Sequence, residues 1–250
     1  MYPRATVDLA KTPSNLGILD RENAAICGVS IAAIRHWRSG SRRNGEQDGP
    51  RCPRCDGRPL DERAYAYLLG LYLGDGHMTV SSKGVWALSI SCCDGWPGLM
   101  AQARLAMSAV MPFSKVFAVA RTGCTEIKST SKHWLCLFPQ HGPGRTHERV
   151  IELELWQERI VAEYPGDFAR GLFHSDGCRA INRVRPLKDG DRWYEYPRYF
   201  FVNHSVDIHR LCGEALDRLG VEWRFSKPTT ISVARRDAVA RLDRFVGPKY

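Results

Sequence analysis

The chain has 250 residues, enough for one large domain or two small ones. Its 36 Lys and Arg outnumber its 27 Asp and Glu, giving a formal net charge of +9 that favours a polyanionic partner. The sequence holds neither an apolar run long enough to cross a bilayer nor the apolar core of a secretion signal. Its nine cysteines are odd in number and scattered, so we expect a reduced, cytoplasmic protein without a disulfide framework.

Residues 1–43 predict a small all-α unit. Asp20 is placed to cap a helix over about residues 21–27, and Ser30 to cap a second helix that runs to about Ser39. A Gly-Val turn separates the two helices, and apolar residues recur at helical spacing in the second one.

A helix, a glycine turn and a basic second helix are typical of a helix-turn-helix DNA-binding unit, with residues 30–38 as recognition helix. The alternative is a generic helical hairpin with a solvated basic face. In the first interpretation, the side chains expected to meet bases or phosphates are Ser30, Arg35, Arg38, Arg42 and Arg43.

Residues 44–61 are polar, rich in Gly and Pro, and predict a linker. Within the linker, Cys52-Pro-Arg-Cys55 is one half of a possible Zn²⁺ site. A structural zinc ion needs four ligands, and the sequence has no second pair of this kind. Further ligands would come from Cys27, His36, Cys136 or His141. The alternative is a pair of loop cysteines in a reduced cell.

Residues 62–250 predict an α+β domain made of two halves, about 62–140 and 165–250. Each half has the order helix, two strands, helix, two strands, helix. In the first half we expect helices over 64–76, 97–110 and 133–138, and strands over 78–81, 85–92, 115–120 and 124–130. A helix over 151–163 connects the halves. In the second half we expect helices over 167–177, 206–219 and 237–246, and strands over 178–185, 199–203, 222–225 and 230–234.

The first helix of each half carries small residues four positions apart. These are Gly70 and Gly74 in AYAYLLGLYLGDG, and Gly171 and Ser175 in DFARGLFHSDG. This spacing places the small residues on one helix face, where two backbones can approach closely, so we expect the two helices to cross there.

Both of these helices end in Asp-Gly, and the two acids, Asp75 and Asp176, stand 101 residues apart. We expect Gly76 and Gly177 to be left-handed C-caps. An acid at a helix C-terminus faces the negative end of the macrodipole, at a cost of about 0.3–1 kcal/mol. Crossing helices would bring the two acids together, and a cation between them would reverse the sign of this effect. The pair therefore predicts a site for a hard cation such as Mg²⁺.

LLGLYLGDG and ARGLFHSDG resemble the two motifs of a single-chain LAGLIDADG (dodecapeptide) homing endonuclease. The resemblance extends from about residue 64 to the C-terminus and implies duplicated αββαββα halves around the paired helices. It also implies saddle-shaped antiparallel sheets in the major groove of double-stranded DNA, and two or more Mg²⁺ ions held by Asp75 and Asp176 at the scissile phosphates. The chain also resembles bacterial proteins that join this domain to a helix-turn-helix, and such a protein would be associated with the nucleoid.

The strands predicted in the domain carry basic residues with aromatic residues between them. Strand alternation places one set of side chains on the side of the groove and the other against the helices. The alternative is a sheet with a solvated charged face. The arginines expected to contact DNA are Arg179, Arg183, Arg185, Arg224 and Arg235.

The resemblance implies a basic residue near each cleavage site, and Lys128 and Lys227 are the candidates. His77 and His174 flank the acids and either assist them or pack against the helix ends. Three functions remain open: a metal-dependent site-specific endonuclease, a transcriptional regulator on a non-cleaving scaffold, or a structural protein with a basic surface. In the first two we expect a monomer with an internal pseudo-two-fold axis.

Overall fold

The computed structural model describes residues 2–38, 52–184 and 193–249. The chain forms two compact units, Met1–Arg51 and Cys52–Tyr250, and the division falls inside the predicted linker. Three of the predicted DNA contacts, Arg42, Arg43 and Arg185, lie outside the described residues. Among the helices of the described residues, none combines the length and apolar character that a membrane crossing requires.

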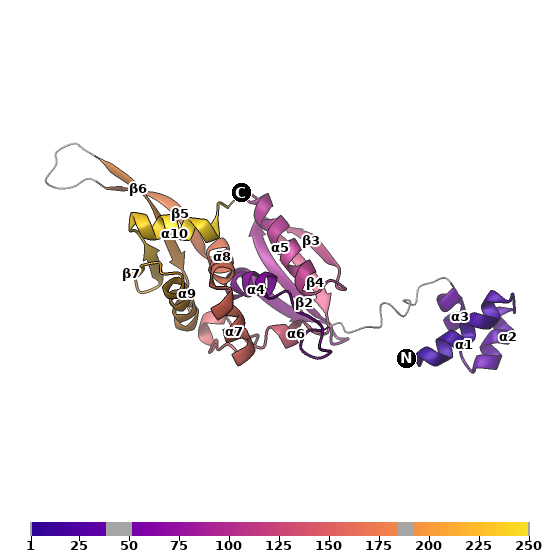
Figure 1. Cartoon of the computed structure of the whole chain (residues 1–250). Coiled ribbons are helices and arrows are strands. Elements are labelled where there is room, and N and C mark those ends of the chain that lie inside the picture. The colour runs from indigo at the N-terminus through magenta and orange to yellow at the C-terminus, as the bar shows by residue number, and fades with distance from the viewer. Residues whose placement is uncertain (1, 39–51, 185–192, 250) are drawn as a thin grey trace. The chain divides into compact units, whose positions relative to one another are not determined.

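The first unit contains three helices, α1 (Arg4–Asn15), α2 (Asp20–Cys27) and α3 (Ile31–Arg38) (Figure 1). They enclose a small core of buried apolar side chains, Val7, Ala10, Ala24, Ile34 and Trp37. A buried hydrogen bond of 2.6 Å from Asn23 Nδ2 to the Ala10 carbonyl joins α2 to α1. The regularly spaced apolar side chains of α3 therefore form one side of a packed three-helix core.

The turn between α2 and α3 is formed by Gly28, whose φ of 63° lies in the left-handed region that glycine adopts without strain. Ser30 caps α3 by accepting a hydrogen bond from the Ala33 N–H at 3.2 Å. The expected cap at Asp20 is wrong, because Asp20 is the first residue of α2 and Leu19 is its N-cap. The Asp20 carboxylate instead accepts Arg38 at 2.7 Å and contacts Arg35 at 3.4 Å.

The second unit has the duplicated order that the sequence predicts. The first half is α4 (Glu62–Asp75), β1 (Gly76–Val80), β2 (Trp86–Cys93), α5 (Pro97–Val110), β3 (Val116–Arg121), β4 (Cys124–Ser131) and α6 (Trp134–Leu137). The second half is α8 (Pro165–Ser175), β5 (Gly177–Val184), β6 (Tyr194–Val202), α9 (Val206–Arg218), β7 (Arg224–Lys227), β8 (Thr230–Val233) and α10 (Arg236–Val246). A 3₁₀ turn (Thr146–Glu148) and α7 (Leu155–Glu163) connect the halves. The α+β class with duplicated halves is confirmed.

Two boundaries differ from the prediction by more than two residues. The helix predicted from residue 151 begins only at Leu155, because the preceding residues are held extended by the buried side chain of Ile151 and its N–H bond to Asp207 at 2.8 Å. Strand β6 begins at Tyr194, in a stretch read from the sequence as loop. There Tyr194 pairs with Val184 across the hairpin, so cross-strand pairing extends the strand beyond its apolar part.

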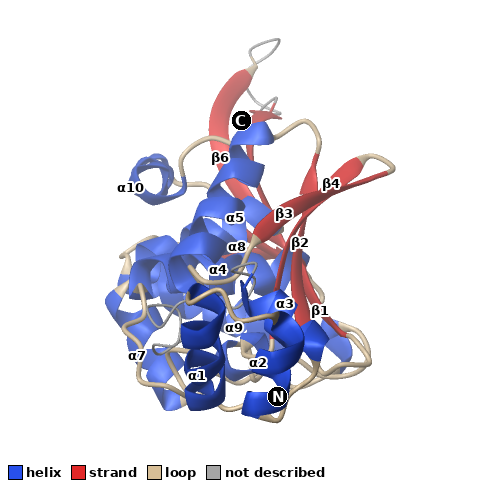
Figure 2. Ribbon diagram, turned by 90° about the vertical axis from the view of Figure 1, so that its right-hand side faces the viewer, coloured by secondary structure: helices blue, strands red, loops and turns tan. Residues whose placement is uncertain are grey.

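Each half contains one four-stranded antiparallel sheet, ordered β1-β2-β4-β3 and β5-β6-β8-β7. The registers are equivalent: Gly76 pairs with Ile90 and Ile90 with Ile127, while Gly177 pairs with Phe201 and Phe201 with Ile231. Buried apolar residues on these strands face the helices, and in Figure 2 α4, α5 and α8 lie to one side of β2, β3 and β4. The alternate side chains of each strand lie on the opposite face of its sheet, which we call the open face.

Helices α4 and α8 cross at the small residues that the sequence predicts. A Cβ added to Gly70 would lie 2.5 Å from the Phe168 carbonyl oxygen and 2.8 Å from the Leu172 nitrogen. A Cβ added to Gly171 would lie 2.9 Å from both Gly70 Cα and Leu71 N. Real Cβ atoms do not approach backbone this closely, so the crossing requires glycine at both positions.

We therefore expect Gly171→Ala to destabilise the second unit by about 3 kcal/mol or more, because overpacking here can be relieved only by separating two backbones. An alanine would otherwise favour a helix by about 1 kcal/mol. The matched control is Gly95→Ala, whose added Cβ meets only Cys93 Sγ, at 3.8 Å. Urea unfolding of both variants measures the effect, and a Gly171→Ala variant as stable as the control would contradict the close crossing.

Candidate active site

Asp75 and Asp176 lie at the end of the crossing. Asp75 is the last residue of α4, and Asp176 caps α8 with φ −89° and ψ 3°. The Asp176 Oδ2 atom lies 2.9 Å from the position that a Cβ on Gly74 would occupy, so the second acid rests against the residue before the first. Ser175, opposite Gly74, turns its hydroxyl back to donate to the Leu172 carbonyl at 2.9 Å. The small residues thus bring the two acids together.

The prediction that Gly76 and Gly177 are left-handed caps is wrong. Gly76 has φ −93° and ψ 145°, and Gly177 is not among the glycines with positive φ. Each begins a strand directly after its helix, so the backbone passes straight from helical to extended geometry. A Cβ would meet the Tyr72 carbonyl oxygen at 2.6 Å in the first case and Phe173 Cα at 2.6 Å in the second. The glycines therefore serve close packing rather than backbone handedness.

Both carboxyl groups have a raised pKa. Burial and the Asp176 charge together raise the pKa of Asp75 to about 6, and Lys249 opposes the shift. Burial also raises the pKa of Asp176, opposed by a 2.6 Å hydrogen bond from Asn203 Nδ2 and by Lys249. Desolvation and like charge both disfavour ionisation, so the site favours the arrival of a cation.

Lys249 supplies a positive charge that the sequence analysis missed. Its Nζ donates to the Gly177 carbonyl at 2.6 Å and to the Ser175 carbonyl at 3.2 Å. The Ser175 carbonyl is at the C-terminal end of α8 and carries the negative end of that helix dipole. Carboxylates and main-chain carbonyls are all oxygen ligands, and the carbonyls already hold an ammonium group, so the donor set fits a hard cation such as Mg²⁺.

His174 holds the segment that brings Lys249 to the acids. Its Nε2 donates to the Val246 carbonyl at 2.8 Å, and its Nδ1 accepts the Tyr67 hydroxyl at 2.9 Å. Burial lowers the pKa of His174 to about 4, so the imidazole is neutral at pH 7. Of the two predictions for His174, the structure favours packing: it joins α8, α4 and the end of α10.

Lys128 and Lys227 do not occupy equivalent positions. Lys128 lies on the sheet face away from the helices, where its Nζ donates to Glu126 at 2.9 Å. The registers make Ser232 its equivalent in the second half, and Arg198 Nε donates to the Ser232 hydroxyl at 2.6 Å. Lys227 lies in edge strand β7 opposite Thr230. The basic group of the second half at this position therefore comes from Arg198.

Strand alternation divides the predicted DNA-contacting arginines between two faces. Arg179 lies on the helix side, where it donates to Asp243 of α10 at 2.8 and 3.1 Å. Arg183 shares that parity, packs over Trp193 and pairs with Glu195 at 3.3 Å. These two therefore do not lie on the open face with Arg198.

Arg224 and Arg235 lie elsewhere. Arg224 pairs with Ser232 on the open face. It lines a hollow of about 450 Å³ together with Arg235, Tyr196 and Trp223. Arg235 is paired with Glu222 at 2.7 Å. Glu195 and Glu222 also line the hollow, and Trp223 donates to Asp217 of α9 at 2.8 Å, so the hollow lies at the edge of the second sheet and has mixed charge.

The cysteine pair of the predicted linker lies beside α6. Donor atoms of Cys52, Cys55, His133 and Cys136 all lie within 4.8 Å of one another. Cys136 was among the predicted partners. His141 was another, but it instead bonds the Tyr72 hydroxyl at 3.2 Å. His133 was missed, although its position three residues before Cys136 on a helical turn is a usable signal.

We expect Asp75→Asn to stabilise the protein above pH 7 by up to about 3 kcal/mol, because the folded-state pKa of Asp75 is raised from 3.8 to about 6. A raised carboxyl pKa means that ionised Asp75 destabilises the fold. The gain therefore develops as the pH rises from about 4 to 6, and it falls below about 1 kcal/mol at pH 4. Urea unfolding at several pH values measures it, with the exposed Asp94→Asn as control. A gain in stability that does not change with pH would contradict the raised pKa of Asp75.

The comparisons with known proteins bear on the fold. No protein-family model and no curated protein matches the sequence. A structure of mesophilic variants of the homing endonuclease I-DmoI is 18% identical, with a TM-score of 0.51, covering 75% of this chain and 91% of that one. I-DmoI in complex with DNA and Mn is 17% identical, with a TM-score of 0.50, covering 76% and 99%. These likenesses show that the chain has the LAGLIDADG fold.

Proposed function

We propose that this chain is a sequence-specific DNA-binding protein that hydrolyses DNA phosphodiester bonds with metal ions held by its paired aspartates. The observation that carries the proposal is the meeting of Asp75 and Asp176 at the crossing of α4 and α8, where burial raises the pKa of both carboxyl groups and the charge of Asp176 raises the pKa of Asp75 as well. Two buried like charges destabilise the fold and so have no structural role of their own. Binding a cation would give the pair a function.

A metal ion supplies a hydroxide nucleophile at neutral pH and stabilises the leaving oxygen. In this chain, Asp75 and Asp176 would hold the ions, with the Ser175 and Gly177 carbonyls beside them. Lys249 neutralises part of the pair when no metal is bound, and its amine is well placed to be replaced by Mg²⁺ because the same oxygen atoms suit both. Asn203 orients the Asp176 carboxylate.

The open faces of the two sheets are the proposed DNA-binding surface. Lys128 lies on the open face of the first sheet. Arg198 lies on that of the second, where it donates to Ser232, the counterpart of Lys128. A two-stranded ribbon fits the major groove, where arginine can grip guanine and lysine can neutralise phosphate. The pseudo-two-fold arrangement would place one basic group near each strand of the duplex.

Two structures of the same fold support this proposal, because each contains DNA and was obtained with a divalent metal ion. One is I-DmoI in complex with DNA and Mn. Another is an I-DmoI variant in complex with its target DNA in the presence of Mg, at 17% identity and a TM-score of 0.50, covering 76% of this chain and 98% of that one. The shared fold makes DNA and a divalent cation the ligands to test first.

The nuclease proposal predicts Mg²⁺-dependent cleavage of a supercoiled plasmid library carrying candidate target sites. Asp75→Asn and Asp176→Asn, singly and together, should each reduce the cleavage rate at least about 100-fold, since each removes several kcal/mol of metal-dependent stabilisation. The control is Asp94→Asn, which removes an exposed carboxylate. Cleavage that persists in the double variant would show that the paired acids are not the catalytic site.

The second candidate function is a DNA-binding regulator that does not cut. It is favoured by the three-helix unit, in which a glycine turn joins α2 to an α3 whose Arg35 and Arg38 are largely exposed. In this reading Ser30 caps α3, and Arg35 and Arg38 would exchange their partner Asp20 for phosphates. Specific binding by wild type and by the double aspartate variant, with no cleavage by either, would favour this function over the first.

Affinity for DNA should depend on the open face whether or not the chain cuts. We expect Lys128→Gln and Arg198→Gln each to weaken binding and to lower the slope of log K against log salt by about 1, because each removes one phosphate neutralisation. Arg210→Gln, an equal charge change on α9 where Arg210 pairs with Glu214, is the control. Fluorescence anisotropy across a salt series gives the slopes. Equal slopes in all three variants would place the DNA elsewhere.

A further inference from the structure

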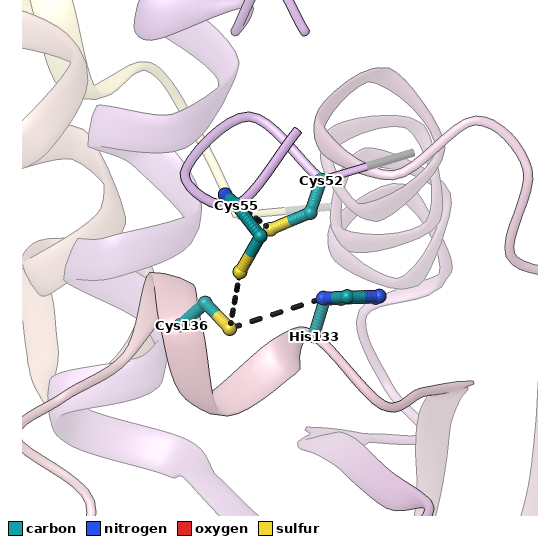
Figure 3. A group of neighbouring side chains, drawn as sticks. All are labelled: Cys52, Cys55, His133 and Cys136. Atoms are coloured by element: carbon teal, nitrogen blue, oxygen red, sulfur yellow. Dashed lines mark hydrogen bonds between the residues drawn. The ribbon is translucent and has the colours of Figure 1, made fainter. Parts of the chain in front are cut away.

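The cluster around Cys52 has no part in the paired-acid site. Figure 3 shows Cys52 and Cys55 on one turn, facing His133 and Cys136 at the α6 turn. The Cys55 and Cys136 sulfur atoms are 3.3 Å apart, and Cys136 Sγ lies 3.9 Å from His133 Nδ1. Three thiols and one imidazole thus converge from two segments about 80 residues apart in sequence.

The spacing of the donor atoms suits a tetrahedral ion. Zinc–sulfur bonds of about 2.3 Å imply sulfur–sulfur separations of roughly 3.8 Å along the edges of a tetrahedron. The four donor atoms lie within 4.8 Å of one another. The Cys55 and Cys136 sulfur atoms, 3.3 Å apart, are slightly closer than that edge, and Cys136 Sγ lies 3.9 Å from His133 Nδ1. The donor atoms are therefore already gathered to within about 1 Å of the separations that a tetrahedral ion requires.

The backbone presents the first pair of ligands in a tight turn. The Asp56 N–H donates to the Cys52 carbonyl at 3.0 Å, and the Asp56 carboxylate accepts the Cys52 N–H at 3.0 Å. The Cys55 N–H points at Cys52 Sγ, 3.4 Å away, an arrangement that stabilises a thiolate. Gly57 then turns the chain away with a φ of 66°. The turn is therefore fixed by its own hydrogen bonds with both sulfur atoms on one side.

A helical turn presents the second pair. His133 is the N-cap of α6 and Cys136 lies within that helix, three residues later, so both side chains share one face. The Cys136 N–H bonds the His133 carbonyl at 3.1 Å, and the Ser131 hydroxyl accepts the His133 N–H at 3.1 Å. The end of β4 thus sets the position of the histidine.

We propose that Cys52, Cys55, His133 and Cys136 form a structural Zn²⁺ site. Three sulfur ligands and one imidazole select zinc over the hard cations suited to the aspartates. Four protein ligands leave no open position for water, so the site would hold structure rather than catalyse a reaction.

The site would fix the segment that leads into the paired helices. Cys52 is the first residue of the second unit, and α4 begins ten residues later at Glu62. Apart from the cluster, this segment is held by cation–π contacts of Arg54 with Trp156 at 4.6 Å and of Arg58 with Phe113 at 4.7 Å. Helix α6 has only four residues, too few to be stable alone. A metal cross-link would stabilise both segments at once.

Metal analysis of tag-free full-length protein, purified with a reductant, tests the proposal. We expect one zinc per chain by mass spectrometry of the metal content, and after exchange with Co²⁺ the intense visible bands of tetrahedral, thiolate-bound cobalt. Cys55→Ser and Cys136→Ser should lose both signals. The exposed Cys93→Ser is the matched control and should keep them, as should the Asp75→Asn/Asp176→Asn double variant. A chelator should lower the unfolding temperature of wild type and of both controls, and it should leave that of the Cys55→Ser and Cys136→Ser variants unchanged.

Three results would overturn the proposal: no zinc and no cobalt spectrum in zinc-replete wild type, zinc retained by the Cys55→Ser/Cys136→Ser double variant, or a Cys55–Cys136 disulfide in the intact mass of the native protein. If the cysteine variants fail to fold, the zinc content and cobalt titration of wild type still decide. DNA cleavage is not a readout here, so failure of the zinc site and failure of the nuclease proposal remain distinguishable.

Discussion

The close approach of two helix backbones is the constraint on which the second unit depends. At Gly70 and Gly171 a single methyl group would collide with main-chain atoms of the opposite helix. This approach is what brings Asp75 and Asp176, one turn further on, to a shared position. It also sets the two sheets, which begin directly after the acids at β1 and β5, in equivalent places around the crossing. The glycine contacts that pack the two helices therefore also position the two acids of the candidate site.

Most of this arrangement could be predicted from sequence, because its signals are local and occur twice. Small residues four apart, a terminal acid and the same succession of elements recur after 101 residues. The repeated order α4, β1, β2, α5, β3, β4 has its counterpart from α8 onward. Boundaries failed where distant groups decide them: Ile151 is held extended by Asp207, and Tyr194 is paired with Val184. Neither partner is visible in a local pattern.

Of the candidate active site, only the two aspartates could be predicted from the sequence. Lys249 reaches them from the end of the chain because His174 holds Val246, a connection that no spacing reveals. Lys227 looked equivalent to Lys128, but strand register gives that place to Ser232, with Arg198 bonded to it. Gly76 and Gly177 were predicted to be left-handed caps, but neither has a positive φ. A side chain at these positions would instead collide with Tyr72 and Phe173. Register and long-range packing decide these positions.

The two proposed cation sites differ in ligand chemistry and therefore in the ion that each would bind. The buried acids oppose folding when ionised, since desolvation and mutual repulsion both raise the pKa of Asp75. The scaffold must therefore obtain its stability elsewhere, and the buried core around α4 and α8 supplies most of it. Sulfur ligands at Cys52 and Cys136 would add a metal cross-link that Mg²⁺ cannot occupy. An oxygen site that exchanges its cation and a sulfur site that retains its own can then act in one chain without competing.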